Sequence, residues 1–479
     1  MGRIHGVIVD AKSGARVTAK VHIHDAQGTS IRPPDSVEKV GPGLPFFYCD
    51  GEFEVEALRG QADITIERGT EYTPFNAAVQ IPKEGTVDLT AELKRWAELP
   101  AAGWYPGNTH IHYDEKETRP YDRLRYDADT ETYNVTVVSL LQRWDLDYAS
   151  NHFPVGVMTD YSTAHHVVDI GEENRHNDHS DQMAYGHVMF LRLRNQVDPV
   201  SRGFLVDAFS PDYPPLCFAC DEAREQGGIV IWCHNGIGME APVAAVLGKL
   251  DAFNLFDPFW MDPEYDIWYA MMNCGISLPA STGTDWFVCS NNRVYVQQDG
   301  AFEYDGWLDG MTRGRTFITN GPALFLEADG GGPGSTIEAG GDHTAHARVT
   351  WQSHYPINKV ALVVNGDLVE TQAFEDGSRD GVWEVDVPIS SNGWIAARCS
   401  GLARDSFSQA IYAHTSPVHV RGGRANPKQV AAANAFAAGI DRSVNWVRTT
   451  GRFTADKQRD DVLDLFRKGA VAYQALADD

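Results

Sequence analysis

Gly107-Asn108-Thr109-His110-Ile111-His112 places two histidines two residues apart at the end of a predicted strand. Because side chains on a strand repeat every two residues, His110 and His112 project from the same face, about 6–7 Å apart along it. Two imidazoles presented together in this way can share one transition-metal ion. The spacing alone is weak support, since His22-Ile23-His24 repeats it within an ordinary alternating strand. The rest of the chain must therefore decide whether a metal site is present.

The composition predicts a globular protein of several domains. The chain has 479 residues, 43% hydrophobic and 22% charged, and a single core seldom grows beyond about 250–300 residues. A net charge of −26 argues against nucleic acid or a membrane surface as partner, because both require basic patches. No apolar run approaches the ~18 residues of a membrane span. Seven cysteines, an odd number, suit a reducing cytoplasm.

Four segments differ in residue pattern. Residues 1–100 consist of short alternating runs separated by turns, which predicts a β-sandwich, and Gly6–Asp10 and Asp50–Phe53 are similar to the carboxypeptidase regulatory-like domain. Residues 101–322 alternate strand-like and helix-like segments, an α/β pattern. Residues 323–424 return to strands and turns such as Asn365-Gly366, which predicts a second β-sandwich. Residues 425–479 have apolar side chains at helical spacing and predict a C-terminal helical tail.

The α/β segment contains several apolar runs that we expect to be buried parallel strands with helices between them. The strands are Val135–Leu141, His187–Leu193, Gly228–Cys233 and Ile276–Ala280, and the helices are Phe218–Gln226 and Glu264–Asn273. Nine of the 17 histidines of the chain fall between residues 110 and 234, which favours a site in this segment.

Potential metal ligands recur at the ends of these predicted strands, where the active sites of α/β barrels lie. They are His110, His112, Glu173, His187, His234 and Asp285. Any one of these histidines could instead be a hydrogen-bonded residue that ends a strand. Four histidines and two carboxylates in equivalent places favour a metal site.

The segments around these residues resemble the CehA/McbA family of metal-dependent hydrolases, a branch of the polymerase-and-histidinol-phosphatase (PHP) superfamily. The matching segments are Gly103–His112, Gly171–Glu173, Gly186-His187, Gly227–His234 and Ala280–Asp285, followed by Arg313–Pro322 and Ala413–Val418. The resemblance implies a distorted PHP-like barrel of about seven βα units, a (β/α)7 barrel with metal ions at its mouth. In this chain the barrel would lie between the two β-sandwiches.

The resemblance also implies a role for each ligand. His110, His112 and Asp285 would hold one metal ion, Glu173 would bridge, and His187 and His234 would hold a second. Imidazole and carboxylate ligands suit Zn²⁺ best, with Mn²⁺ or Fe²⁺ as alternatives. One or two ions per chain would generate a metal-bound hydroxide as nucleophile and polarise the bond that is cut.

Two positions depart from the superfamily pattern. Many members complete a third metal site with an Asp-His pair and an Asp-x-His motif, where this chain has Asn151-His152 and Asp285-Trp286-Phe287. This departure argues against trinuclear phosphoesterase chemistry. His152 then becomes a candidate general acid for the leaving group, beside Glu173 and Asp285 as catalytic residues, although a role in orienting other ligands is equally open.

Three arginines lie close in sequence to the predicted site loops and are candidate substrate-binding residues. They are Arg143, Arg175 and Arg293. Surface or interdomain ion pairs are the alternative for each of them.

These features predict a cytoplasmic metal-dependent hydrolase that cleaves an ester, carbamate or amide bond of a small organic substrate. A PHP-type phosphoesterase is one alternative, and a non-catalytic glycan- or partner-binding protein with a structural metal is another. The sequence contains no G-x-S-x-G elbow, P-loop or dinucleotide motif. We expect a small-molecule partner and neither nucleic acid nor membrane, and a homo-oligomer remains open.

Overall fold

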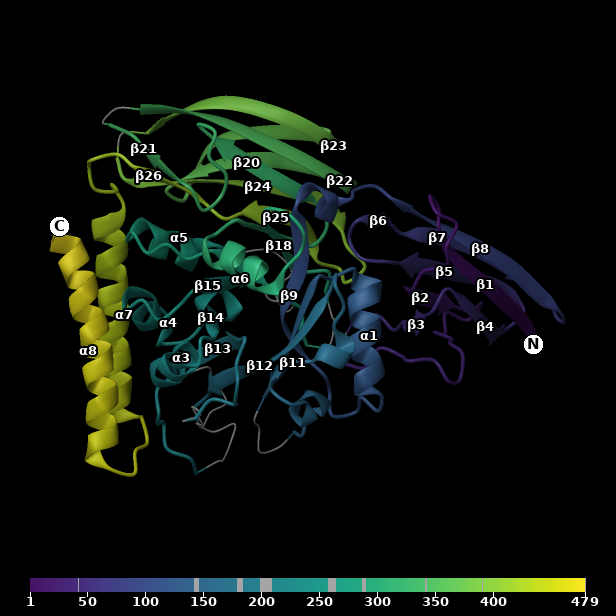
Figure 1. Cartoon of the computed structure of the whole chain (residues 1–479), viewed down its shortest axis with the longest axis horizontal. Helices are drawn as coiled ribbons and strands as arrows, with labels where there is room; N and C mark the ends of the chain where they lie inside the picture. Colours follow the sequence, from purple (N-terminus) through teal and green to yellow (C-terminus); the bar gives the residue numbers. More distant parts are fainter. Residues whose placement is uncertain are drawn as a thin grey trace.

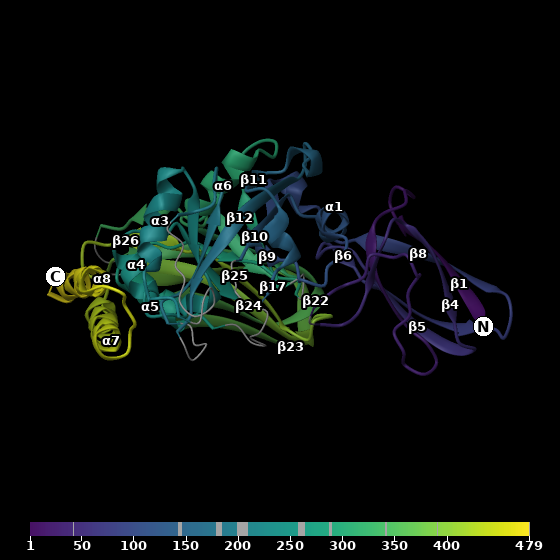
Figure 2. The same cartoon turned by 90° about the horizontal axis from the view of Figure 1, so that it is seen from below.

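The computed structural model describes the whole chain except residues 42, 142–145, 179–183, 199–208, 257–263, 287–289, 341–342, 390 and 479. The chain is a mixed α/β structure dominated by β-sheet. The N-terminal strands lie at one end of the long axis and the helices α7 and α8 at the other (Figures 1 and 2). Among the described residues, no helix has the length and apolarity to span a membrane.

Residues 2–95 form two four-stranded sheets, ordered β4-β1-β8-β6 and β3-β2-β5-β7. Inward side chains of both sheets, such as Ile4, Val55 and Ile64, share one apolar core, as alternation along each strand requires. The strands are β1 (Gly2–Asp10), β2 (Ala19–His24), β3 (Phe47–Cys49), β4 (Glu52–Ala57), β5 (Gly60–Glu67), β6 (Tyr72–Thr73), β7 (Phe75–Ile81) and β8 (Thr86–Arg95).

The strands that follow belong to one continuous sheet that closes on itself. β9, β10 and β12 are parallel, β14, β15 and β16 are parallel, and β17 closes the circuit by pairing parallel with β9. The strands are β9 (Trp104–His112), β10 (Val135–Leu140), β11 (Gly156–Val157), β12 (Val167–His176), β13 (Gly186–Leu191), β14 (Ile229–Trp232), β15 (Ala252–Phe256), β16 (Ala280–Thr282), β17 (Asp285–Trp286), β18 (Arg293–Gln297) and β19 (Thr316–Thr319).

The expectation that residues 187–193 form a parallel strand is wrong. β13 runs antiparallel to both of its neighbours, β12 and β14. The nine residues between β12 and β13 are too few for the crossover that a parallel pair needs, which takes a dozen residues or more. The reversal puts the beginning of β13, where His187 lies, at the same end of the sheet as the last residues of β9 and β12.

Helices cover this central sheet and connect its strands (Figure 1). They are α1 (Pro120–Glu131), α3 (Leu216–Glu225), α4 (Ala241–Val246), α5 (Asp266–Asn273) and α6 (Tyr304–Thr312), with short 3₁₀ turns η1 (Leu99–Ala102), η2 (Ala149–His152), η3 (Thr159–Tyr161) and η4 (His234–Gly236). Trp268 of α5 and Trp307 of α6 are buried in the same core as strand residues such as Val230. The helices expected at 218–226 and 264–273 are therefore present, with bounds shifted by up to two residues.

The C-terminal strands have a second core of their own, which includes Leu324, Trp351 and Ile395. β25 also pairs with β19, so this region is continuous with the central sheet. The strands are β20 (Ala323–Ala328), β21 (Thr336–Glu338), β22 (His343–Val364), β23 (Asp367–Ile389), β24 (Gly393–Arg404), β25 (Ala410–Thr415) and β26 (Val418–Arg421). The domain boundaries at 100, 322 and 424 stay a prediction.

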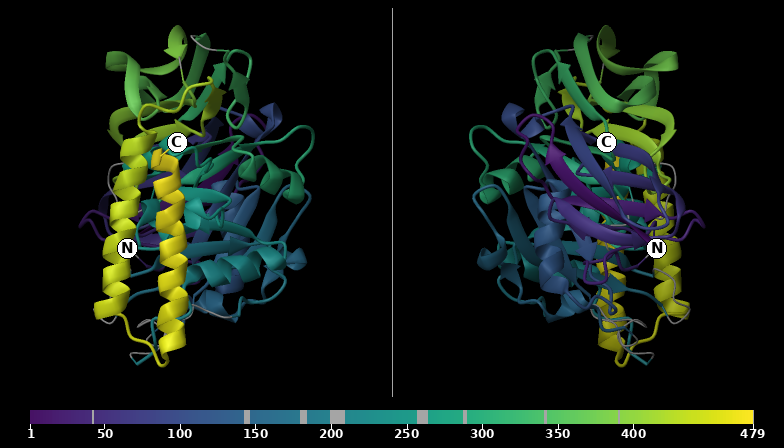
Figure 3. Two further views of the ribbon diagram at one scale, coloured as in Figure 1. Left: turned by 90° about the vertical axis from the view of Figure 1, so that its left-hand side faces the viewer. Right: turned by 90° about the vertical axis from the view of Figure 1, so that its right-hand side faces the viewer.

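The chain ends in a helical hairpin, α7 (Gln429–Thr449) and α8 (Asp456–Asp478), seen face-on in Figure 3. Its apolar face contributes Ile440, Val447 and Phe466 to the core of the central sheet. The Tyr473 hydroxyl donates a hydrogen bond to the Pro242 carbonyl of α4 at 3.0 Å. The hairpin therefore packs on its own chain.

A buried charge cluster joins the N-terminal sheets to the central sheet. The Glu131 carboxylate at the end of α1 lies 2.6 Å from Lys20 Nζ of β2 and 2.9 Å from an Arg293 nitrogen of β18. All three side chains are almost fully buried. The Tyr48 hydroxyl also donates a hydrogen bond to Asp127 of α1 across the same junction.

Candidate metal centre

Three of the predicted ligands come from two adjacent strands, β9 and β17. All nine residues of β9 are buried, and His110 and His112 project from it to one side, with their Nε2 atoms 3.2 Å apart. Asp285 is in register with Ile111, between the two histidines. Its Oδ1 lies 3.3 Å from His110 Nε2 and 3.5 Å from His112 Nε2. The structure thus brings these three ligand atoms together.

Glu173 of β12 lies at the centre of the cluster, and its two oxygens face different histidines. Oε2 lies 2.8 Å from His112 Nε2 and 3.6 Å from His110 Nε2. Oε1 lies 3.2 Å from His187 Nδ1 and 3.3 Å from His234 Nε2. All six predicted ligands are therefore at one buried site, arranged as two sets around one carboxylate.

The outer hydrogen bonds of two histidines determine which of their nitrogens faces the cluster. His112 Nδ1 lies 3.0 Å from the Ser139 carbonyl oxygen, which can only accept, so Nδ1 carries the proton. His187 Nε2 likewise donates to Asn177 Oδ1 at 2.8 Å. The inward nitrogens, His112 Nε2 and His187 Nδ1, face the oxygens of Glu173. His187 is neutral at pH 7, so its inward nitrogen presents a lone pair to a carboxylate oxygen, an arrangement that a bound cation stabilises.

The protonation states fit the same interpretation. Burial lowers the pKa of His110 to about 4 and that of His187 to about 3, so both imidazoles are neutral at pH 7. Burial acts to raise the pKa of Glu173, but Arg175 and His110 outweigh it, and the pKa lies well below its ordinary value. Neutral imidazole and ionised carboxylate are the forms that bind metal ions.

The backbone holds two of the ligands in an unusual conformation. His234 and Asp285 have φ of 55° and 52°, in the left-handed region that few residues other than glycine adopt. Gly283 sits against β9, where an added Cβ would lie 2.6 Å from the His110 nitrogen. Such strained positions cluster at functional sites, because only a surrounding structure that fixes them can maintain them.

Arg175, a predicted substrate-binding residue, lies beside the cluster. It donates to Glu173 Oε2 at 2.8 Å, and its guanidinium lies 5.6 Å from the centre of the Trp286 ring. The side chain is buried. Arg175 is thus positioned to hold Glu173 ionised and in place.

The structure does not bring the other predicted residues to this cluster. The His152 side chain is 68% exposed, and its Nε2 lies 3.2 Å from Asp147 Oδ2. His152 therefore lies at the surface. Arg293 is fully buried in the ion pair with Glu131, which occupies its guanidinium. Arg143 lies outside the described residues.

Three further residues belong to this site and are not among the predicted ones. Cys233 has its sulfur within 4.8 Å of ligand atoms of Glu173 and His234. Its position directly before His234 at the end of a strand was the available signal. Asn108 Oδ1 accepts the N–H groups of His110 and Thr284, and so ties β9 to the turn before Asp285. For Asn177 no signal was available, because its contact depends on the reversal of β13.

Comparisons with known proteins do not assign a function to this chain. No family model matches the chain, and no curated protein matches it. Among solved structures, a Parabacteroides merdae beta-glucuronidase is 8% identical, with 85% of this chain and 60% of that chain covered and a TM-score of 0.17. The chain spans only that 60% of the enzyme's length, and a TM-score this low supports no conclusion. What the structure defines is a β-rich α/β protein with a buried His/Glu/Asp cluster that could hold a metal ion.

Proposed function

We propose that this protein is a metal-dependent hydrolase of the CehA/McbA type that cleaves an ester, carbamate or amide bond of a small organic substrate. The observation that carries the proposal is the convergence of four imidazoles on the two oxygens of Glu173 in a buried site. A neutral imidazole and an ionised carboxylate that face each other are in the protonation states in which both bind a metal ion.

The residues present fit one or two divalent ions, Zn²⁺ best and Mn²⁺ or Fe²⁺ as alternatives. His110, His112 and Asp285 with Glu173 Oε2 would form one set, and His187 and His234 with Glu173 Oε1 the other. The parallel strands β9, β10 and β12, interrupted by the reversed β13, are consistent with a distorted PHP-like (β/α)7 barrel with this cluster at its mouth.

A metal ion held by these residues would supply Lewis acidity and lower the pKa of water. The protein's part is to keep its ligands deprotonated and fixed. Arg175 keeps Glu173 ionised, and the Ser139 carbonyl holds the His112 ring by its outer nitrogen. Tyr148 and Trp286 lie with ring centres 6.0 and 5.8 Å from that of His112, and limit the access of bulk water to it.

The test is metal content and hydrolysis on protein purified without a metal-affinity tag. We expect one or two Zn, Mn or Fe per chain, lost in His112→Ala together with at least about 100-fold of the hydrolysis rate, or ~2.7 kcal/mol. The matched control is His24→Ala, from the other His-x-His of the chain.

The substrate panel separates the rival functions. Turnover of an aryl acetate or aryl carbamate supports the proposal, and turnover of an aryl phosphate alone would select a phosphoesterase. Full metal content with no turnover would select the non-catalytic binding protein. Unchanged metal content and hydrolysis rate in His112→Ala would contradict the proposal.

A further inference from the structure

A small cavity of about 200 Å³ lies between the C-terminal strands and the start of α5. It is lined by Tyr265, Lys359, Ala361, Arg398, Cys399, Ser400 and Tyr412. Lys359 of β22 is in register with Ser400 of β24, and Ala361 with Arg398. Residues two apart on a strand share a face, so the two cations and the Ser400 hydroxyl project from the same side of the sheet.

Within the described parts of the chain, neither Lys359 nor Arg398 lies within ion-pair distance of a carboxylate. The neighbours of Arg398 include two neutral rings: its guanidinium lies 5.6 Å from the centre of the Tyr265 ring and is also close to Tyr269. Burial lowers the pKa of the adjacent His414 to about 3, so that imidazole is uncharged as well. This local excess of positive charge occurs in a chain with a net charge of −26.

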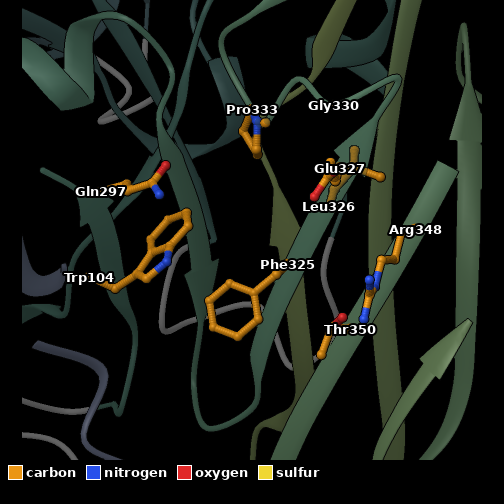
Figure 4. Close-up of a pocket in the computed structure, with 10 residues that line it drawn as sticks. Trp104, Gln297, Phe325, Leu326, Glu327, Gly330, Pro333, Arg348 and Thr350 are labelled. Atoms are coloured by element: carbon orange, nitrogen blue, oxygen red, sulfur yellow. The ribbon is translucent and has the colours of Figure 1, made fainter. Parts of the chain in front are cut away.

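A larger cavity, also lined by residues of β22, differs in that the charge of its arginine is balanced (Figure 4). It has a volume of about 430 Å³, and Trp104 and Phe325 lie on one side of it with Arg348 on the other. Arg348 is in register with Glu327 on one side and Glu384 on the other. Its charge is therefore balanced by neighbouring carboxylates, and Arg348 offers a matched control on the same strand as Lys359.

The small cavity lies at the metal-binding end of the central sheet. The strands β25, β19, β18 and β9 are successive neighbours. In their register Ala413 pairs with Thr319, Thr319 with Arg293, and Val294, next to Arg293, with Gly107. Tyr412 is therefore level with the end of β9 that carries His110. The Tyr412 hydroxyl donates to Asn292 at 3.2 Å and also bonds Thr282. Thr282 precedes the ligand Asp285 by three residues, a span of at most about 10 Å. Tyr412, which lines the cavity, is therefore linked through Thr282 to the strand end that carries Asp285.

We propose that this cavity binds the oxyanion group, a carboxylate or a phosphate, of the small-molecule substrate, with Lys359 and Arg398 as its binding residues. That the anion is part of the substrate depends on the proposed function, whereas the existence of the anion site does not. Arginine presents paired N–H donors that match either oxyanion, and lysine adds a point charge. The volume is below the about 300–1,000 Å³ typical of whole-ligand pockets, so it suits one group rather than an entire molecule.

The experiment measures binding of benzoate and of inorganic phosphate by calorimetry, at constant ionic strength maintained with chloride. We expect saturable binding of at least one anion, weakened at least about tenfold in the Lys359→Gln/Arg398→Gln double variant and unchanged in Arg348→Gln. The stronger of the two anions identifies the group. Lys359→Gln alone, at a half-buried site, gives a partial loss if the double variant does not fold. Binding that is equal in wild type and the charge variants, or absent for both anions, overturns the inference.

A second arm distinguishes this site from the metal centre. We expect anion binding to persist in His112→Ala, because the cavity does not use the metal ligands. Binding that disappears in that variant would assign the anion to the metal and overturn the inference. With a hydrolysable ester, the double variant should raise KM at least about tenfold for a substrate with a free carboxylate, and leave its neutral methyl ester unaffected.

Discussion

At Glu173 a single carboxylate meets four imidazoles and a guanidinium, and two of the imidazoles, those of His112 and His187, are oriented by hydrogen bonds to other residues. The ligands themselves could be predicted, because histidines at strand ends are visible in the sequence. Their supports could not. Asn177 becomes a partner of His187 only through the turn back from β12 to β13, and the Ser139 contact uses a backbone carbonyl that any residue would supply.

The Asn177 contact leads to a prediction about metal affinity. Asn177→Ala should leave the fold intact but weaken metal binding by about 10–100-fold, because His187 loses the acceptor that fixes its tautomer and ring orientation. Competition with a chromogenic chelator measures this affinity. Asn358→Ala, at a side chain of β22 that bonds only C-terminal strands, is the control. An unchanged affinity in Asn177→Ala would show that the ring is held by packing alone.

At the scale of elements, the residue that caps the N-terminus of α3 could not be predicted from the sequence. Its first two N–H groups, those of Leu216 and Cys217, donate to the Glu240 carboxylate at 2.8 and 2.7 Å. Glu240 lies just before α4 and is fully buried, so the acceptor for α3 comes from the next helix along the chain. Sequence rules for capping search only adjacent residues, and Pro215 in the cap position offers no side-chain acceptor.

Glu240 makes stability depend on pH. Burial raises its pKa from 4.5 to about 7, so its contribution is complete below pH 4.5 and is lost as the pH rises through 7. The loss amounts to about 3 kcal/mol. Relative to wild type, Glu240→Gln should therefore gain that amount between pH 4.5 and 7.5, as measured by urea unfolding. Glu225→Gln, at an exposed position on α3, should show no such trend. If the unfolding free energies of Glu240→Gln and wild type changed in parallel with pH, Glu240 would not be the source of the pH dependence.

At the scale of the whole molecule, the division into sheet-rich and mixed segments was predictable from residue periodicity, but their connections were not. The alternation of Phe53, Val55 and Ala57 with charged residues is by itself enough to indicate a half-buried strand. The pairing of β17 with β9 and that of β25 with β19 join residues more than 90 positions apart, and no local pattern encodes such contacts. The same holds for Arg293, whose position near a site loop suggested substrate binding but whose partner is Glu131.

The junction cluster predicts an asymmetry between two substitutions. Glu131→Gln leaves Lys20 and Arg293 buried without their shared carboxylate, and should cost about 3–5 kcal/mol of unfolding free energy. Lys20→Met leaves a neutral Glu131–Arg293 pair and should cost clearly less. Chemical denaturation of both variants measures the difference. Equal costs would contradict the prediction and mean that Lys20 matters to the junction as much as Glu131 does.

The closure of the sheet by β17 against β9 has a consequence for biosynthesis. His112 and Asp285 are neighbours in space but 173 residues apart along the chain (285 − 112). At about 5–20 residues per second, the ribosome delivers His112 roughly 9–35 s before Asp285. During that interval any ion bound to the early histidines lacks the carboxylate that completes its set. If the cluster binds a metal ion, stable loading would therefore follow the emergence of β17, and a chain stalled before residue 285 would carry an incomplete set of ligands.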